Sequence, residues 1–193
     1  TRPVTKSALI GLAPQARPNA RILILGSMPG AVSLAQQQYY AHPRNAFWPI
    51  MGQLFDFAYD LPYPQRLMQL QAQGIGLWDV LQSCERQGSL DSAIRAETPN
   101  DFASLLQQQP QIRALAFNGA KAAQSFRKLV LPTLAPEQVP ALMQLPSTSP
   151  AHASPASGPI ECLPRVGFSP TSPHIDAGMR MEPPPSPACA IGT

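Results

Sequence analysis

Uncharged residues that could bind or orient a ligand are concentrated in one segment, residues 26–49, with the sequence GSMPGAVSLAQQQYYAHPRNAFWP. Gly26 and Gly30 would let the backbone approach a ligand closely, and the exposed amides of such a turn bind anions or carbonyl oxygens. Tyr39 or Tyr40 could stack on a nucleobase, and the Asn45 amide could orient a water molecule or bind a carbonyl edge. The string contains no acid. It therefore indicates a ligand held by aromatic faces and amides rather than by ion pairs.

Each of these features also has a purely structural interpretation. GSMPG could be a tight turn between a strand and a helix, and Asn45 could be the N-cap of a helix that begins at Ala46. His42, which precedes a proline, is typical of a turn residue. Tyr39 and Tyr40 could be core or interface aromatics, but neighbouring residues of a strand point to opposite sides, so at least one would face a crevice.

Polar residues farther along the chain add candidates. Asp79 follows the apolar run GIGLW and could pair with amide or amine edges of a ligand, or serve as a turn residue or cap at a strand end. Asp91 and Ser92 are predicted to cap a helix. The string PSTSPAHA, residues 146–153, offers hydroxyls and backbone amides that could grip phosphates, unless it is an ordinary surface loop.

Apolar runs and turn residues predict strands that alternate with helices. The strands are predicted at residues 21–26, 74–81, 112–119 and 141–145, which are short and strongly apolar. The helices are predicted at residues 45–58, 63–74, 98–110 and 120–131, with Asn100 or Asp101 as an N-cap, Gly74 as a C-cap and the last helix ending before Pro132.

Four alternations of strand and helix are typical of an α/β fold with a parallel sheet and right-handed crossovers. In such a sheet the ligand crevice lies outside the carboxyl ends of the strands. The segments that arrive there are Gly26–Gly30, Asp79, Asn118–Gly119 and Ser147–His152. The predicted fold thus brings the glycine and polar candidates to one edge of the sheet.

Composition narrows the class of protein. The chain has 193 residues, 44% of them apolar and 13% charged, which suits one soluble domain with a real core. A net charge of +3 permits an anionic partner such as nucleic acid. Cys84, Cys162 and Cys189 lie far apart with no CxxC pair, which argues against a zinc or iron–sulfur site and predicts free thiols in a reducing cytoplasm.

The two ends of the sequence differ from its middle. Residues 1–20 read as an N-terminal extension without the apolar core of a secretory signal, and no apolar run is long enough to span a bilayer. Residues 21–153 read as the α/β domain. Residues 154–193 are rich in proline and have neither helical nor alternating period, so they are predicted to be a poorly ordered tail. These features together indicate an intracellular, cytoplasmic protein.

Four strings, in this order, resemble the motifs of the uracil-DNA glycosylase superfamily: GSMPG, YYAHPRNAFW, GLWDV and LPSTSPAHA. The likeness is greatest to its hypoxanthine-DNA (deoxyinosine) glycosylase branch, and AHPRNAFW is also similar to the mismatch-specific enzymes. The resemblance covers roughly residues 20–153. It implies a three-layer αβα fold with a four-stranded parallel sheet. It also implies an enzyme that flips a deaminated base out of DNA and hydrolyses its N-glycosidic bond without a metal or cofactor.

The resemblance also implies roles for individual residues. Gly26, Ser27 and Met28 match the first motif, which lines the base pocket, and Tyr40 matches the aromatic that stacks on the flipped base. Classical members carry Asp, and mismatch-specific members Asn, at the place of Met28, which has no such polar group. The hypoxanthine branch shares this lack, and there the Asn of the PRN string is the catalytic residue. The resemblance therefore implies that Asn45 is catalytic and positions the attacking water.

The remaining correspondences concern base reading and DNA contact. Asp79 falls where other members carry a base-reading Asn, and Asn118 and Gly119 fall near the turn that grips phosphates. The second motif, whose loop enters the DNA, is expected to supply Ser147, Thr148, Ser149 and His152. Its first position holds Leu145 rather than the His of many members, as in the hypoxanthine branch.

The resemblance implies a monomeric, DNA-binding glycosylase that acts on hypoxanthine, with uracil as a further candidate substrate, at the bacterial nucleoid. Family members continue after the second motif into a basic helix, whereas this chain continues into its proline-rich tail. A DNA- or base-binding remnant without turnover is therefore an alternative. A third reading is an unrelated nucleotide-binding protein. The missing phosphate-loop Lys-Ser/Thr and GxGxxG motifs count against that third reading.

Overall fold

The computed structural model describes residues 8–150. Its main sheet is parallel and contains four strands in the order β3-β2-β6-β7. The strands are β2 (Ile22–Gly26), β3 (Ile75–Asp79), β6 (Ala114–Asn118) and β7 (Ala141–Leu145). All four lie within or at the predicted apolar runs. The predicted α/β fold with a four-stranded parallel sheet is thus confirmed.

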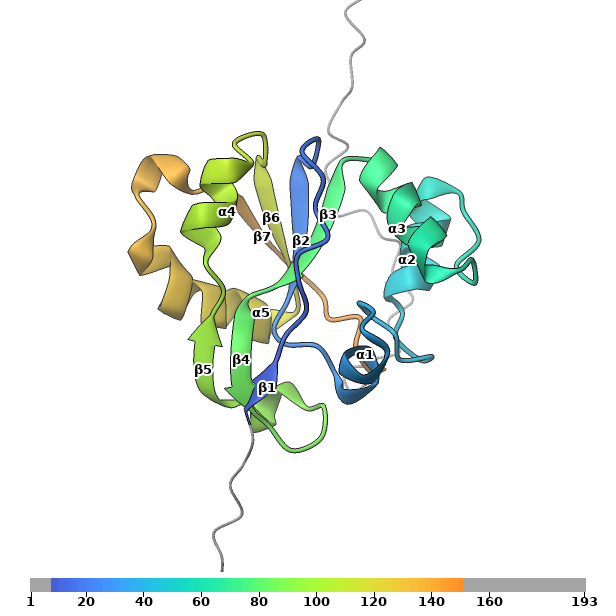
Figure 1. Cartoon of the computed structure of the whole chain (residues 1–193), viewed down its shortest axis with the longest axis horizontal. Helices are drawn as coiled ribbons and strands as arrows, with labels where there is room; N and C mark the ends of the chain where they lie inside the picture. The colour runs from blue at the N-terminus through green and yellow to red at the C-terminus, as the bar shows by residue number, and fades with distance from the viewer. Residues whose placement is uncertain (1–7, 151–193) are drawn as a thin grey trace, which may run out of the picture. The chain divides into compact units, whose positions relative to one another are not determined.

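Helices lie on both sides of this sheet. They are α1 (Ala31–Gln36), α2 (Phe47–Phe55), α3 (Tyr63–Ala72), α4 (Phe102–Gln108) and α5 (Ala120–Ser125). In Figure 1, α2 and α3 lie on one side of β2 and β6, and α4 and α5 lie on the other, which gives the predicted three layers. Helix α1, directly after β2, lies near the carboxyl ends of the strands.

Local sequence explains where these helices begin and end. Pro49 and Pro64 lie in the first turns of α2 and α3, where a proline costs no hydrogen bond. Gly74 follows α3 with a φ of 73°, a left-handed conformation that favours glycine. The Asp101 side chain accepts a hydrogen bond from the backbone amide of Ser104 and so caps α4.

The helix predicted at residues 120–131 is interrupted. Regular α-helix ends at Ser125, and the chain continues as a π-helical turn at Phe126–Val130 and a 3-10 turn at Leu131–Thr133. The expectation of one α-helix ending before Pro132 was therefore wrong. Phe126 is fully buried against other aromatic rings. Pro132 has no amide hydrogen to continue an α-helix, so the irregular turns end the helix while the aromatic ring stays in the core.

A second sheet, antiparallel and of three strands in the order β1-β4-β5, was not predicted. It consists of β1 (Leu9–Ile10), β4 (Leu81–Glu85) and β5 (Arg95–Pro99). Only Val80 separates β3 from β4, so the two strands read as one apolar run in the sequence. Short 3-10 turns at Asp91–Ala93 and Pro136–Gln138 complete the described elements.

Residues 9–20, which belong to the predicted N-terminal extension, contact the two sheets. Strand β1 pairs with β4, and Gln15 forms an isolated bridge with Leu77 of β3. Ala20 is buried. The predicted tail, residues 154–193, lies outside the described residues.

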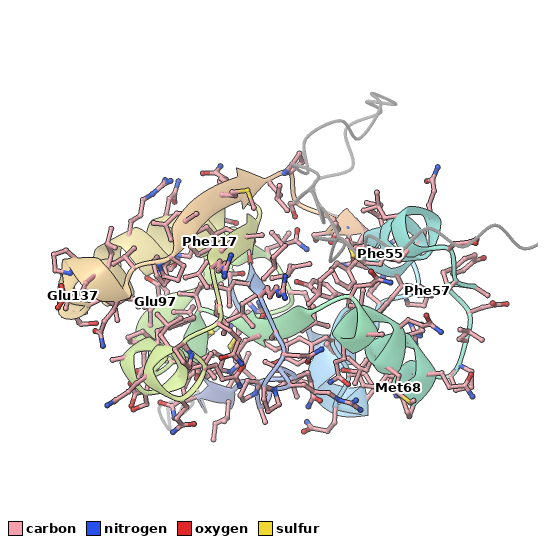
Figure 2. All side chains as sticks on the ribbon, turned by 90° about the horizontal axis from the view of Figure 1, so that it is seen from above. Phe55, Phe57, Met68, Glu97, Phe117 and Glu137 are labelled. Atoms are coloured by element: carbon pink, nitrogen blue, oxygen red, sulfur yellow. The ribbon has the colours of Figure 1, made fainter. Side chains whose placement is uncertain are left out.

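The core lies between the main sheet and its helices. Phe117 of β6 is fully buried and packs against Phe126, which also contacts Phe102 of α4. Figure 2 shows Phe117 between Glu97 and Glu137 toward one end of the molecule and Phe55, Phe57 and Met68 toward the other. Within residues 8–150 there is no helix long and apolar enough to cross a membrane.

Candidate active site

The carboxyl ends of the four parallel strands form one row. Gly26 of β2 is in register with Asp79 of β3, and Asn118 of β6 is in register with Leu145 of β7. A cavity of about 260 Å³ opens at this edge. The predicted site residues that line it are Gly26, Ser27, Met28, Tyr40, Asn45, Asp79, Asn118, Ser147, Thr148 and Ser149. The edge predicted from sequence is therefore where these residues meet.

One predicted site residue of the described part of the chain does not line this cavity. Gly119 lines a neighbouring surface cavity that also contains Arg95 and Lys121. Its φ is 100°, and a Cβ there would lie 3.1 Å from the Ser147 Cβ, so glycine permits the close approach of this turn to the loop after β7. His152 lies outside the described residues.

Gly26 is required by the position of Asp79. A Cβ built on Gly26 would lie 2.5 Å from Asp79 Oδ1, closer than side-chain contacts allow. The backbone amide of Val80 donates a hydrogen bond to the Gly26 carbonyl, which ties the first turn to β3. The glycine of GSMPG thus makes room for a carboxyl group, which the turn interpretation alone would not require.

Asp79 is the buried acid of the cavity. It is 4% exposed, and its Oδ2 atom has no hydrogen-bond partner among the described residues. Burial raises the pKa of this carboxyl to about 7, although the positive charge of Arg86 lowers it and the negative charge of Asp91 adds to the increase. The Asp79 backbone carbonyl accepts a hydrogen bond from Asn100 Nδ2, which fixes the strand end.

Tyr40 presents both a ring and a hydroxyl to the site. The ring stacks on Phe47, with 3.9 Å between centroids and 21° between planes. The residue has a φ of 55°, and its hydroxyl, without a hydrogen-bond partner among residues 8–150, is a buried polar atom that lines the cavity. Burial and the negative charge of Asp79 raise the pKa of the phenol, while the Asn118 side chain lowers it.

Tyr39, in contrast, is mainly a structural residue. It is buried, and its hydroxyl donates a hydrogen bond to the Ala13 carbonyl at 2.8 Å. Its backbone carbonyl accepts from Trp48 Nε1. Tyr39 and Tyr40 lie in a turn rather than in a strand, so the strand alternation assumed from sequence does not apply.

Asn45 combines its structural and functional interpretations. Its Oδ1 accepts a hydrogen bond from the Phe47 amide at 2.9 Å, at the first residue of α2. The helix begins one residue later than the N-cap interpretation assumed, because Ala46 is the cap. The side chain nevertheless lines the cavity. An amide oxygen has a second lone pair, so this contact leaves Asn45 able to bind a ligand or water.

The loop after β7 is fastened beside Asn45. The Thr148 amide donates to Asn118 Oδ1 and Asn118 Nδ2 donates to Thr148 Oγ1, both at 2.9 Å. The Thr148 carbonyl accepts from the Ala46 amide at 3.0 Å. Residues 147–149 are thereby joined both to the end of β6 and to the start of α2.

Replacement of Asn118 with alanine should remove both side-chain hydrogen bonds to Thr148. Because a hydrogen bond contributes about 1 kcal/mol net, we expect the free energy of unfolding to fall by about 2 kcal/mol. Urea denaturation followed by tryptophan fluorescence measures this. Thr148→Val, which removes only the hydroxyl, should give a smaller loss. Equal stability of the Asn118→Ala protein and the wild type would show that these two hydrogen bonds do not hold the loop in place.

A loop that sequence reasoning missed covers the first turn. Ser27 Oγ donates to Asp91 Oδ1 at 2.6 Å, the Ala31 amide donates to Ser89 Oγ at 3.0 Å, and the Arg86 guanidinium donates to the Pro29 carbonyl. Asp91 was predicted to cap a helix, but its side chain makes no cap hydrogen bond and accepts from Ser27 instead. In the sequence, the polar string RQGSLDS, residues 86–92, was the feature that could have indicated this loop.

Charges are sparse around the cavity. The ion pair recorded within residues 8–150, Lys121 with Glu97 at 2.7 Å, joins α5 to β5 and involves no residue that lines the cavity. The same residues contain no group of three or more His, Cys, Asp or Glu side chains able to hold a metal ion. The cavity is lined by the carboxyls of Asp79 and Asp91, the tyrosines Tyr39 and Tyr40, the His42 imidazole, and amides and hydroxyls.

A family model described as the uracil DNA glycosylase superfamily matches residues 13–163. The chain belongs to this superfamily. The match contains every predicted site residue and extends from the segment before β2 past the loop after β7.

Curated relatives of this superfamily member are named hypoxanthine DNA glycosylases. The protein of Methanosarcina acetivorans is 44% identical over 105 residues, which are 54% of this chain and 66% of that protein, just under two thirds. The protein of Methanosarcina barkeri is 40% identical over 113 residues, 58% of this chain and 72% of that one. Both likenesses support the predicted hypoxanthine branch.

A solved structure shows the same fold. It is the solution NMR structure of a proposed uracil DNA glycosylase from Methanosarcina acetivorans, 36% identical in sequence with a TM-score of 0.65. The likeness covers 75% of this chain and 87% of that one. The fold prediction therefore agrees both with the strand order and with a solved structure of this superfamily.

Proposed function

We propose that the chain is a monofunctional DNA glycosylase that hydrolyses the N-glycosidic bond of deaminated bases, with hypoxanthine as its main substrate and uracil as a second one. The observation that carries the proposal is the cavity at the carboxyl edge of the sheet, which gathers Tyr40, Asn45 and Asp79. Two relatives named hypoxanthine DNA glycosylase, 44% and 40% identical, support the same activity.

The proposed reaction needs few acids. As the bond between C1′ and the base nitrogen breaks, the electron pair leaves with the base and the sugar becomes an oxocarbenium-like cation. Fixed donors in the cavity stabilise the base anion, and a positioned water adds to C1′ and releases a proton, which neutralises the base anion. DNA phosphates help to stabilise the cation. The products are an abasic sugar and the free base.

Individual residues have distinct tasks in this proposal. Tyr40 stacks on the extruded base, which contributes about 1–3 kcal/mol per base in other systems. Asn45 positions the water, and Asp79 contacts the base edge. Ser27 and Met28 shape the wall of the pocket.

DNA contact is assigned to the loop after β7. Ser147, Thr148 and Ser149, together with Asn118 and Gly119, offer hydroxyls and amides of the kind that hold phosphates. His152 belongs to the same proposal. The net charge of +3 favours an anionic partner. We also assign the protein a monomeric state and a place of action at the intracellular DNA.

Base release from end-labelled duplexes tests the function. One duplex carries a single deoxyinosine and another a single deoxyuridine, and alkali cleaves the abasic product. We expect release from both, faster from deoxyinosine. An undamaged duplex of the same sequence is the control. Binding of the damaged duplexes by folded protein without any base release would overturn the enzymatic proposal in favour of a DNA-binding remnant.

A further inference from the structure

Two buried polar atoms at the inner end of the cavity have no hydrogen-bond partner among the described residues. They are Asp79 Oδ2 and the Tyr40 hydroxyl oxygen. Both side chains lie beside Gly26, because a Cβ there would be 2.5 Å from Asp79 Oδ1 and 3.7 Å from the Tyr40 hydroxyl. Since buried polar atoms are normally satisfied, the unpaired carboxyl oxygen of Asp79 in a ligand cavity indicates a group reserved for a ligand, whereas the Tyr40 hydroxyl interacts with the Asn118 side chain as well.

The charge state of Asp79 follows from its surroundings. Arg86 comes from the loop after β4, and its guanidinium donates to the backbone carbonyls of Pro29 and Gly88. The hydrogen bonds and ion pairs recorded for residues 8–150 include no cation on the Asp79 carboxyl. An ionised carboxylate that is buried without a bonded cation is strongly disfavoured relative to the neutral acid.

The other titratable groups around this carboxyl do not supply such a cation. Asp91, whose carboxylate is bonded to Ser27, adds negative charge. Tyr39 and Tyr40, from the turn after α1, are phenols. His42, from the same stretch, lines the cavity as well, so a His42 variant serves as a control.

We propose that Asp79 meets the flipped base as a neutral carboxylic acid, whose O–H donates to the oxo group of the base and whose C=O accepts from the adjacent ring N–H. This inference rests on the proposed function and specifies how its substrate is read.

The pairing matches the chemistry of deaminated bases. Deamination replaces an amine by an oxo group beside a ring N–H, and hypoxanthine, uracil and xanthine share this lactam edge. A neutral carboxyl offers one donor and one acceptor, which complement that edge. A carboxylate would offer acceptors only, facing the oxo oxygen. It would also put a second negative charge beside the base anion that forms as the glycosidic bond breaks.

A pH series of hypoxanthine release tests the proposal. The kcat/KM of the wild type should fall about tenfold per pH unit above a pH of about 7, where Asp79 ionises. Asp79→Asn retains one donor and one acceptor at every pH. It should therefore keep activity within roughly tenfold of the low-pH wild type and lose this alkaline fall.

Two further variants test whether Asp79 is the group whose ionisation lowers kcat/KM at high pH. Glu97→Gln changes an acid outside the cavity and should leave the profile as it is. His42→Gln should retain the fall as well. The proposal is overturned if the fall disappears in His42→Gln, if it persists in Asp79→Asn, or if folded Asp79→Asn is inactive at every pH.

Proton uptake provides a readout that does not depend on turnover. A duplex with 2′-fluoro-deoxyinosine, which resists cleavage, is titrated calorimetrically at a pH of about 8 in two buffers of different ionisation enthalpy. The wild type should take up close to one proton more than Asp79→Asn does, relative to an inosine-free duplex. Equal uptake by the two proteins would contradict the neutral acid.

The two proposals fail in different ways. If the wild type releases neither hypoxanthine nor uracil at any pH, the glycosylase assignment fails and this inference falls with it. The wild type could instead release base while the pH profiles of the variants, or the number of protons taken up, contradict a neutral Asp79. In that case the glycosylase proposal stands and only the role of the neutral Asp79 is lost.

Discussion

Asn45→Ala is expected to lower the rate of hypoxanthine release by roughly two to three orders of magnitude, because in the proposed reaction the attacking water loses the group that positions it. Binding of the damaged duplex should change much less, since Tyr40 and Asp79, the residues proposed to hold the base, are unchanged. Single-turnover base release with enzyme in excess measures the chemical step, and anisotropy measures binding.

The structural role of Asn45 calls for a matched control. The variant also loses the hydrogen bond from Asn45 Oδ1 to the Phe47 amide at the start of α2, a loss worth about 1 kcal/mol of stability. Asp101→Ala removes the comparable hydrogen bond to Ser104 at the start of α4, away from the cavity. If both variants slow base release equally, Asn45 acts through helix stability and not on the water.

Asp79→Asn is expected to raise the thermal stability of the protein at a pH of about 8, by several degrees in Tm. An unfolded aspartate loses its proton near a pH of about 3.9, whereas burial raises the pKa of native Asp79 to about 7. Between these values the native chain holds more protons, so the free energy of unfolding decreases as pH rises, by up to a few kcal/mol. The amide of the Asp79→Asn variant cannot ionise, so the variant does not lose this free energy of unfolding as pH rises.

Thermal melts at several pH values check this expectation. The two proteins should differ most above a pH of about 7 and converge near a pH of about 4. Glu97→Gln is a control of opposite sign. Burial favours the neutral form of Glu97, but hydrogen bonds from Lys121 and Ser125 outweigh it and lower its pKa. That variant should therefore be less stable than the wild type at a pH of about 8. If the difference in Tm between Asp79→Asn and the wild type does not depend on pH, burial does not raise the pKa of the Asp79 carboxyl.

The parallel sheet was predictable because its strands are short apolar runs that end at turn residues. Three successive residues are buried in each central strand, Leu23, Ile24 and Leu25 in β2 and Leu115, Ala116 and Phe117 in β6. Because successive side chains point to opposite faces, this is the pattern expected for a sheet covered on both faces. The row of Gly26, Asp79 and Asn118 then follows from the topology alone.

The second sheet was not predictable for an equally physical reason. Strand β5 is mostly exposed and ends at Pro99, so it lacks an apolar signature. Strand β4 follows β3 after a single residue, which removes the turn signal between them. The contacts of Ser27 with Asp91 and of Arg86 with the Pro29 carbonyl join distant segments. Hydrophobic periodicity and turn residues do not indicate such long-range contacts.

The fastening of the loop after β7 has a consequence for folding. The hydrogen bond from the Ala46 amide to the Thr148 carbonyl joins residues more than half the chain length apart, and Thr148 also needs Asn118 in place. Contacts of such high sequence separation carry the largest loop-closure cost and form late. Synthesis, too, supplies Thr148 after every strand of the main sheet. The wall of the cavity is thus completed last, so a nascent chain acquires its fold before it acquires a pocket that can hold a base.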